Sequence, residues 1–427
     1  MINVLRDLRL HGRRRAPTAL AAVLVMAAAC DTETFLEVDA PSLLPAEELE
    51  NPANAALLVN GAIADFECAY GAFVTVQGIM SDELVDAQLG AAAWFYDRRD
   101  AGTNPASAYG VNGCNSAQTP GVYRPVSTAR WSADNVLHLL TDVWERGDVV
   151  NYDALMARSA LYAGFSYTML GMAMCTAAID GGPEVTSASL LGSAETRFTT
   201  AIQAAGAAGL DDVATAAQAG RARVRLYLGD DAGAQADAEA VPLDFSYNAT
   251  FSQDNSRRYN RVFHSNILST NYSIEAQSRG LTTGGVEDPR TLTFDAGTNA
   301  NDGTTLWVQD KYTDYGTPIP IVTGGEALLI RAEIEGGSAA VGYINQLRGR
   351  WSLPTFSSGD PDEIRDALVE ERRRELWLQG HRQYDMARFN VPLSPVPGTP
   401  YPKGGLYGST TCLPLPDVER FNNPNIP

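Results

Sequence analysis

EERRRELWLQGHRQYDMARF, residues 370–389, is the most informative stretch of this 427-residue chain, because three consecutive arginines stand between a pair of glutamates and a third glutamate. The residues before it carry the signals of a helix start. Asp360 suits the N-cap, Pro361 suits the first helical position, and Glu363 completes a capping box. Gly380 suits the position that follows a helix end. The pattern predicts one helix that begins at Pro361 and stops before Gly380.

Two carboxylates fall on the buried face of this predicted helix. Its apolar face contains Ile364, Ala367, Leu368 and Leu378. Glu371 and Glu375 lie one turn apart on the same face, where unpaired charge is costly. A metal site would need further ligands on this face, and an acid/base pair would need a cleft. We therefore expect a structural ion-pair network, with arginines from the set Arg348, Arg350, Arg382 and Arg388.

Composition limits the function classes. The chain is 45% hydrophobic and 19% charged, with a net charge of −19. The electrostatic field of this negative charge repels the phosphate groups of nucleic acids, so we expect no nucleic-acid partner. The sequence contains no P-loop, GxSxG, HExxH or dinucleotide-binding fingerprint, so no cofactor and no catalytic residues are expected.

The N-terminus predicts an exported lipoprotein. Residues 1–29 form a signal peptide with a basic start and a hydrophobic segment too short to span a bilayer. Small residues precede Cys30 in a pattern similar to a bacterial lipobox, although Ala27 stands where leucine is usual. Cys30 is therefore the expected lipidation site, with an ordinary signal peptide as the alternative. The acidic, proline-containing residues 30–50 predict a tether.

Four further cysteines, Cys68, Cys114, Cys175 and Cys412, allow up to two disulfides in an oxidising compartment. Three pairings are open, and Cys175 could equally be a free thiol in an apolar helix. The spacing suits no zinc site, since no CxxC occurs, and we expect no metal.

Hydrophobic periodicity predicts a mainly α fold. Helical repeats are expected over about 54–241 and 321–390, with loop-rich insertions over about 90–126 and 242–320. Two internal segments share one layout: a helix ending near glycine, a tight turn, an alanine-rich helix and then proline. They are residues 221–242 and 327–354, and the layout is typical of tetratricopeptide-like helical hairpins. We expect one domain over residues 51–427.

Residues 370–389 closely resemble the signature of the SusD/RagB family of outer-membrane nutrient-binding lipoproteins. Supporting similarities are LLIRAEIEGGSAAVGYINQLRGR at 328–350, SDELVDA at 81–87, RWSADNVLHLL at 130–140 and the closing LPLPDVERFNNPNIP at 413–427. The chain is short for this family. It also has Thr323-Gly324-Gly325 where an Arg-Tyr-Ala-like run is usual.

The resemblance implies a helical-repeat protein at the cell surface, held in the outer membrane by its lipid. Such a protein would sit as a lid on a TonB-dependent barrel of SusC type and pass it an oligosaccharide or, in some branches, a peptide, without making or breaking a bond. Two alternatives remain: a surface glycoside hydrolase using Asp82 and Glu83, or a tetratricopeptide-type scaffold that binds only proteins.

Aromatic residues on the predicted loops are the candidates for contact with a glycan, because sugars stack on aromatic rings beside polar side chains. One group comes from the first loop: Trp94, Phe95, Tyr96, Arg98, Asn104 and Tyr109. A second group, Trp307 and Tyr315, comes from the insertion. The alternative is that these rings pin loops onto the core. Adjacent residues cannot all point inward, so one of Trp94, Phe95 and Tyr96 is expected to be exposed.

Overall fold

The structure is a computed structural model that describes residues 46–102 and 107–426. The predicted signal peptide, Cys30, most of the tether and Asn104 lie outside the described residues. The short helix α2 (Ala46–Leu49) belongs to an N-terminal unit, and residues from Glu50 onward form one compact second unit. The second unit is described below.

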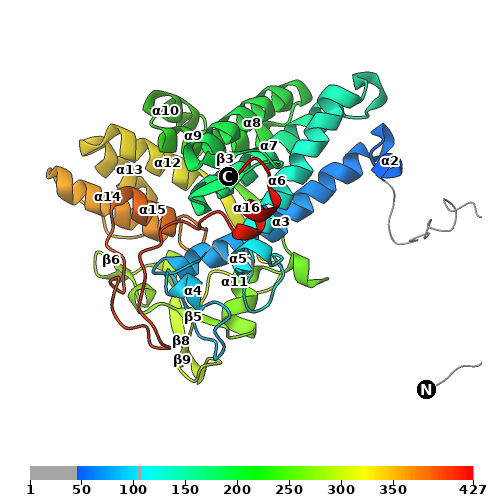
Figure 1. The fold of residues 1–427 in the computed structure, drawn as a ribbon. Coiled ribbons are helices and arrows are strands. Elements are labelled where there is room, and N and C mark those ends of the chain that lie inside the picture. Colours follow the sequence, from blue (N-terminus) through cyan, green and yellow to red (C-terminus); the bar gives the residue numbers. More distant parts are fainter. Residues whose placement is uncertain (1–45, 103–106, 427) are drawn as a thin grey trace, which may run out of the picture. The chain divides into compact units, whose positions relative to one another are not determined.

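Long helices build most of the second unit, as predicted (Figure 1). They are α3 (Ala55–Met80), α6 (Tyr123–His138), α7 (Tyr152–Ala173), α8 (Ser187–Ala208), α9 (Asp211–Leu228), α10 (Asp231–Glu239), α12 (Gly324–Glu335), α13 (Gly337–Arg350), α14 (Pro361–Glu375) and α15 (Arg382–Phe389). Short helices are α4 (Trp94–Asp97), α5 (Ala108–Val111), α11 (Arg261–Phe263) and α16 (Asp417–Asn422). The helices from α6 to α13 pack mainly on their neighbours in the chain, which is the arrangement of a helical repeat.

The two predicted hairpins are present. Helices α9 and α10 are joined at Gly229, and α12 and α13 are joined at Gly336, and both glycines have positive φ. Small residues also let helices approach closely. A Cβ added at Gly164 of α7 or at Gly220 of α9 would lie within 2.7 Å of the Phe198 ring of α8. These glycines therefore set the spacing of three successive helices.

Helix α3 is the central helix of the core. Its length and composition would suffice to cross a membrane, and of the described residues only this helix passes that test. Most of its side chains are buried, and Phe66, Tyr70 and Phe73 lie in a row of stacked rings inside the protein. We therefore interpret α3 as a core helix that its hydrophobic composition makes resemble a membrane span.

Short antiparallel strand pairs make up the insertions. They are β1 (Leu84–Asp86) with β5 (Tyr272–Ile274), β2 (Thr176–Ala178) with β3 (Glu184–Thr186), β4 (Ser246–Ala249) with β10 (Ile319–Thr323), β6 (Thr282–Thr283) with β7 (Val286–Glu287), and β8 (Thr293–Asn299) with β9 (Thr305–Gln309). We call the described residues of 84–122, 251–318 and 391–415 the loop layer. Figure 1 shows elements of this layer on one side of α3 and helices α8 to α10 on the other.

Lys403 joins the three segments of the loop layer. Its ammonium group lies 3.0 Å from a carboxylate oxygen of Asp86 and 2.9 Å from one of Asp302, and it donates to the carbonyl oxygen of Gln88 at 3.0 Å. These contacts hold together parts of the chain that are far apart in sequence. The loop layer is therefore a packed structure with a polar centre.

Helix α14 starts as predicted and ends earlier. The Asp360 carboxylate accepts hydrogen bonds from the backbone N–H groups of Asp362 and Glu363 at 2.8 and 3.2 Å. The predicted return bond of the capping box is wrong, because the Glu363 carboxylate accepts from the Ser358 hydroxyl instead. The helix stops at Glu375, before the turn that contains Gly380.

The early stop places residues 376–380 against the core. Gly380 has φ of 82°, and a Cβ at this position would lie 2.6 Å from the Phe73 ring of α3. Trp377 in the same turn is fully buried. The chain leaves the helix where Gly380 packs closely on α3 and Trp377 becomes buried. The helical periodicity of the sequence continues past this point, so it did not indicate the earlier end.

Both disulfides form, so Cys175 is not a free thiol. Cys68 pairs with Cys114 at a Cα–Cα distance of 5.6 Å, and Cys175 pairs with Cys412 at 5.0 Å. The first bond joins α3 to the first loop. The second joins the residue that follows α7 to the C-terminal segment.

Candidate functional site

The two carboxylates on α14 are both ion-paired to arginines. Arg290 lies 2.6 Å from Glu371 and 3.1 Å from Glu375, and Arg348 lies 2.9 Å from Glu371. Arg290 also pairs with Asp288 at 2.7 Å. Arg290 comes from the insertion, so helix phasing alone could not identify it as the main partner.

Arg382 and Arg388 form ion pairs of their own and do not contact Glu371 or Glu375. The Arg382 guanidinium binds Asp82 through two hydrogen bonds of 2.7 and 2.8 Å. Arg388 pairs with Glu333 of α12 and with Asp385. Arg382 is connected to the Arg290 group only indirectly, since Arg373 pairs with Asp82 at 3.4 Å, Arg374 pairs with Asp288 at 3.7 Å, and both arginines pair with Glu370. The pairs of Arg388 form a second cluster, and both clusters hold α14 and α15 against their neighbours.

Asp82 and Glu83 are unsuited to glycoside hydrolysis as the structure places them. Both are buried, Glu83 completely. The Glu83 carboxylate accepts a hydrogen bond from the backbone N–H of Leu378 at 2.9 Å, and burial raises its pKa to about 7. Since Asp82 is held by Arg382 and neither carboxylate faces solvent, no substrate can reach this pair without rearrangement.

The first loop divides its aromatic residues between surface and core. Trp94 and Phe95 are half-buried, but Tyr96 and Tyr109 are completely buried. The Tyr96 hydroxyl donates to the carbonyl oxygen of Pro120 at 2.9 Å. Tyr96 and Tyr109 therefore pin the loop to the core and cannot contact a ligand, which corrects the prediction for these two residues.

Trp94 lies beside polar groups at the surface of the loop layer. Arg98 pairs with Asp100 at 2.6 Å, and its guanidinium donates to the carbonyl oxygen of Gly404 at 3.2 Å. The ring of Tyr401 lies edge-on to Trp94 with centroids 6.2 Å apart. Sequence reasoning missed Tyr401, although the segment YPKGGLYG at 401–408 combines aromatic residues with a glycine turn.

The second predicted group, Trp307 and Tyr315, also lies among charged and aromatic side chains, as Trp94 does. Trp307, on β9, is half-buried, and the Arg279 guanidinium lies 5.0 Å from its ring centroid. Asp295 is directly opposite Trp307 in the β8–β9 pair. Tyr315 is also half-buried, but its ring packs 4.2 Å from that of Tyr259. Of this group, Trp307 has the neighbours that a sugar site requires.

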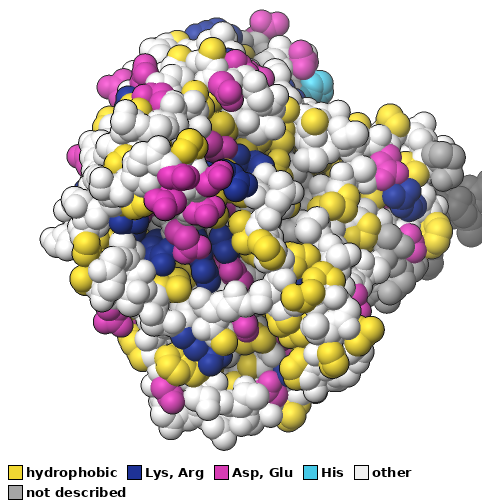
Figure 2. Space-filling view, turned by 90° about the vertical axis from the view of Figure 1, so that its left-hand side faces the viewer, with side chains coloured by type: hydrophobic (Ala, Val, Ile, Leu, Met, Phe, Trp, Pro, Cys, Tyr) yellow, Lys and Arg dark blue, Asp and Glu magenta, His cyan; other side chains and the backbone are white. Residues whose placement is uncertain are grey.

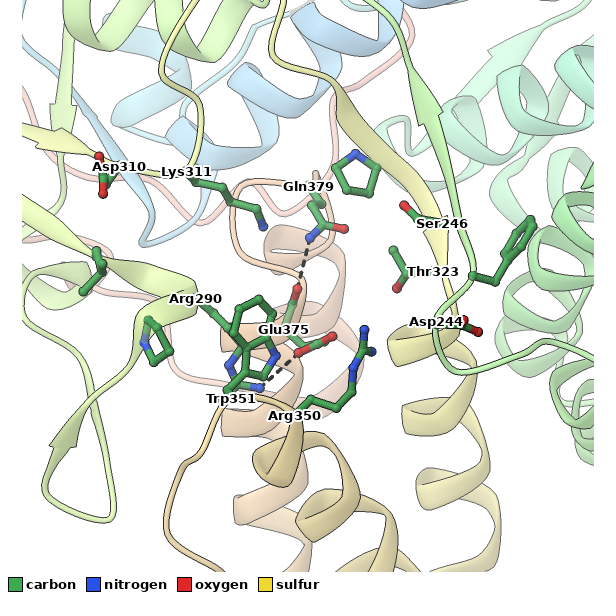
Figure 3. Close-up of a pocket in the computed structure, with 14 residues that line it drawn as sticks. Asp244, Ser246, Arg290, Asp310, Lys311, Thr323, Arg350, Trp351, Glu375 and Gln379 are labelled. Carbon is green, nitrogen blue, oxygen red and sulfur yellow. Dashed lines mark hydrogen bonds and ion pairs between the residues drawn. The ribbon is translucent and has the colours of Figure 1, made fainter.

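A separate cavity lies where the insertion meets the ends of α13 and α14 (Figure 3). Its volume is about 300 Å³, at the small end of ligand pockets. The charged, amide and aromatic side chains of its lining are Asp244, Phe245, Arg290, Asp310, Lys311, Arg350, Trp351, Glu375 and Gln379. The sequence predicted a network containing Glu375, with Arg350 among the possible partners, and the other residues are too far apart in sequence to be grouped by pattern.

Charged side chains of both signs gather on one face of the molecule. Figure 2 shows acidic and basic groups side by side in the middle of that face, with hydrophobic side chains scattered around them. Ion pairs at the surface of α14 have this character, since Glu370 pairs with Arg374 at 2.5 Å. The positive charge of the arginines on α14 is therefore largely neutralised by neighbouring carboxylates.

Comparison with known proteins identifies relatives by sequence. Residues 310–413 match the model of the SusD family. SusD-like protein P2 of Formosa agariphila is 31% identical over 143 residues, which cover 31% of this chain and 26% of that protein. SusD-like protein P38 of the same organism is 30% identical over 123 residues, covering 26% of this chain and 24% of its own. The sequence match thus spans about a quarter of these curated relatives.

Solved structures share the fold over most of the chain. A SusD-like carbohydrate-binding protein from Bacteroides vulgatus has a TM-score of 0.64 and 15% identity, covering 88% of this chain and 97% of its own. A laminarin-binding SusD-like protein has a TM-score of 0.61 and 16% identity, covering 88% and 98%. The helical repeats with their loop layer are therefore a SusD-like fold. The SusD family match over residues 310–413 and this fold over most of the chain bear out the resemblance to the SusD/RagB family.

Proposed function

We propose that this protein binds glycans at the bacterial surface and does so through its loop layer. The observation that carries this proposal is the group around Tyr401: the half-buried Trp94 lies edge-on to the Tyr401 ring, and the guanidinium of Arg98, which pairs with Asp100, lies 5.9 Å from the centroid of the same ring. Sugars are bound by stacking on such rings while planar polar side chains hydrogen-bond their hydroxyl groups. Trp307 with Arg279 and Asp295 repeats this composition.

Relatives make a glycan the favoured ligand class. Structures with the same fold include proteins described as carbohydrate-binding and as laminarin-binding. Capture of a peptide in the same manner is the second candidate, supported by the family resemblance. The burial of Asp82 and Glu83 favours binding over hydrolysis.

The proposal includes a membrane anchor and a partner. The lipobox-like sequence before Cys30 supports lipid attachment in the outer membrane, facing the cell surface. Family membership supports delivery of the glycan to a TonB-dependent barrel of SusC type. Purification of the lipidated protein from outer membranes should recover such a barrel in the same complex. Recovery of the protein alone under mild detergent conditions would count against the partnership.

A glycan array tests the binding function directly. We expect the purified protein to retain oligosaccharides of one linkage class without releasing sugar from them. Sugar release would assign the protein to the hydrolases. If the array yields no ligand while a peptide library does, the peptide candidate replaces the glycan.

A further inference from the structure

We propose that the cavity of Figure 3 is a second binding site, separate from the Trp94 and Trp307 groups, and that it takes a single sugar acid through the cationic side chains of Lys311 and Arg350. The two cations enter the cavity from opposite sides in this view. Neither forms an ion pair with a described residue, although the chain carries a large excess of acidic groups. An anionic group of the ligand is therefore the missing partner.

Lys311 has unused hydrogen-bonding capacity. Its ammonium group donates to the carbonyl oxygen of Trp377 at 2.6 Å and lies 5.7 Å from the Tyr312 ring centroid. An ammonium has three donors, and no other hydrogen bond from it to a described residue is formed. A partly buried cation without a carboxylate partner is unfavourable unless a ligand supplies one.

Arg350 is equally available. It ends α13 and donates one hydrogen bond, of 3.0 Å, to the carbonyl oxygen of Leu243. The guanidinium is exposed and has further donors in a plane that suits a carboxylate. Lys311 and Arg350 therefore both have donors free for the carboxylate and hydroxyl oxygens of a ligand.

The carboxylate of Glu375 does not neutralise these two cations. It pairs with Arg290, whose guanidinium is shared with Glu371 and Asp288. Gly325 has no side chain, and a Cβ there would overlap the Glu375 carboxylate, so this group rests against the first turn of α12. Glu375 still acts on Lys311 through its charge, but it forms an ion pair with Arg290 and with neither Lys311 nor Arg350.

The remaining lining fits the hydroxylated ring of a sugar acid. Gln379 is 5% exposed, and its amide nitrogen donates to the carbonyl oxygen of Glu375, which leaves the amide oxygen to accept from a hydroxyl group. Trp351 is 41% exposed at the rim and offers a face for a pyranose. The volume of about 300 Å³ suits one ring better than a chain.

The wall formed by the start of α12 departs from the pattern that the family resemblance gives. Residues 323–325 are Thr-Gly-Gly, where the resemblance gives larger side chains, and only the Thr323 side chain lines the cavity from this wall. The proposed site therefore lies beside a local departure from the family pattern.

Calorimetric titration with paired sugars tests the proposal. The probes are galacturonate and glucuronate, with galactose and glucose as neutral partners of the same ring shape. We expect at least one uronate to bind at millimolar concentration or below, about tenfold or more tightly than its neutral partner. The absence of uronate binding, or equal affinity for both members of each pair, would overturn the proposal.

Two rim variants locate the site without disturbing the core. Arg350→Gln should remove the preference for the uronate, and Trp351→Ala should weaken both sugars of a pair. Arg365→Gln is a matched control, because Arg365 is exposed and also donates one hydrogen bond to a carbonyl oxygen, that of Phe389. Trp131→Ala, at a tryptophan that is 51% exposed, is the control for Trp351. Unchanged binding in both rim variants would contradict the assignment.

The pH dependence of binding gives a further readout. Burial lowers the pKa of Lys311 to about 8; the charges of Glu375 and Glu83 oppose this shift, and the charge of Arg290 adds to it. A carboxylate bound beside the ammonium raises this pKa, so binding takes up protons. Uronate affinity should therefore fall as the pH rises through about 8. Affinity that stays constant there would show that Lys311 is not a contact.

Discussion

Glu83 is a carboxylic acid in surroundings that disfavour its charge. It is completely buried, and burial raises the pKa of its carboxyl group from 4.5 to about 7. Because the folded protein holds this proton more tightly than the unfolded chain, Glu83 lowers stability progressively as the pH rises from about 4.5 to about 7.

The substitution Glu83→Gln should remove this pH-dependent loss. The glutamine oxygen can still accept the Leu378 N–H, and no charge has to be buried. We expect the free energy of unfolding in urea to exceed that of the wild type by roughly 2–3 kcal/mol near pH 8.5, with little difference near pH 4.5. Glu287→Gln, at an exposed position, should change stability by less than about 0.5 kcal/mol at both pH values. An equal effect of Glu83→Gln at both pH values would contradict the buried charge.

At the scale of single elements, α14 is a helix that connects the helical repeats to the loop layer. Its start was predictable because Asp360 and Pro361 carry local capping chemistry. Its end was not, because packing of Trp377 and Gly380 on α3 decides it. The buried position of Glu371 was predictable from helix phasing, whereas its partner Arg290 comes from the distant insertion.

Loss of Arg290 should therefore destabilise the contact between the insertion and α14. Arg290→Met leaves Asp288, Glu371 and Glu375 without their shared cation, and we expect a loss of about 3–5 kcal/mol in denaturant unfolding. Arg257→Met removes an ion pair with Asp65 at the surface and should cost less than about 1 kcal/mol. Similar small losses in both variants would show that the buried network is not needed for stability.

At the scale of the whole molecule, the helical repeats followed from sequence and the ligand-facing surfaces did not. The repeat layout at 221–242 and 327–354 is local, so glycines and proline mark it directly. The loop layer is assembled by Lys403, by β1 with β5 and by the disulfides, and these join segments of large sequence separation. Composition therefore does not indicate which aromatic residues of the first loop are buried and which lie at the surface.

The central claim is that the loop layer binds the glycan through Trp94. The direct measurement is the affinity of Trp94→Ala for the oligosaccharide that the array selects, beside wild type and Trp131→Ala, with the melting temperature of each. We predict that Trp94→Ala loses detectable binding while its melting temperature falls by no more than a few degrees, and that Trp131→Ala binds normally. Wild-type affinity in Trp94→Ala, or a fall in melting temperature of the size caused by removing a core aromatic residue, would contradict the account.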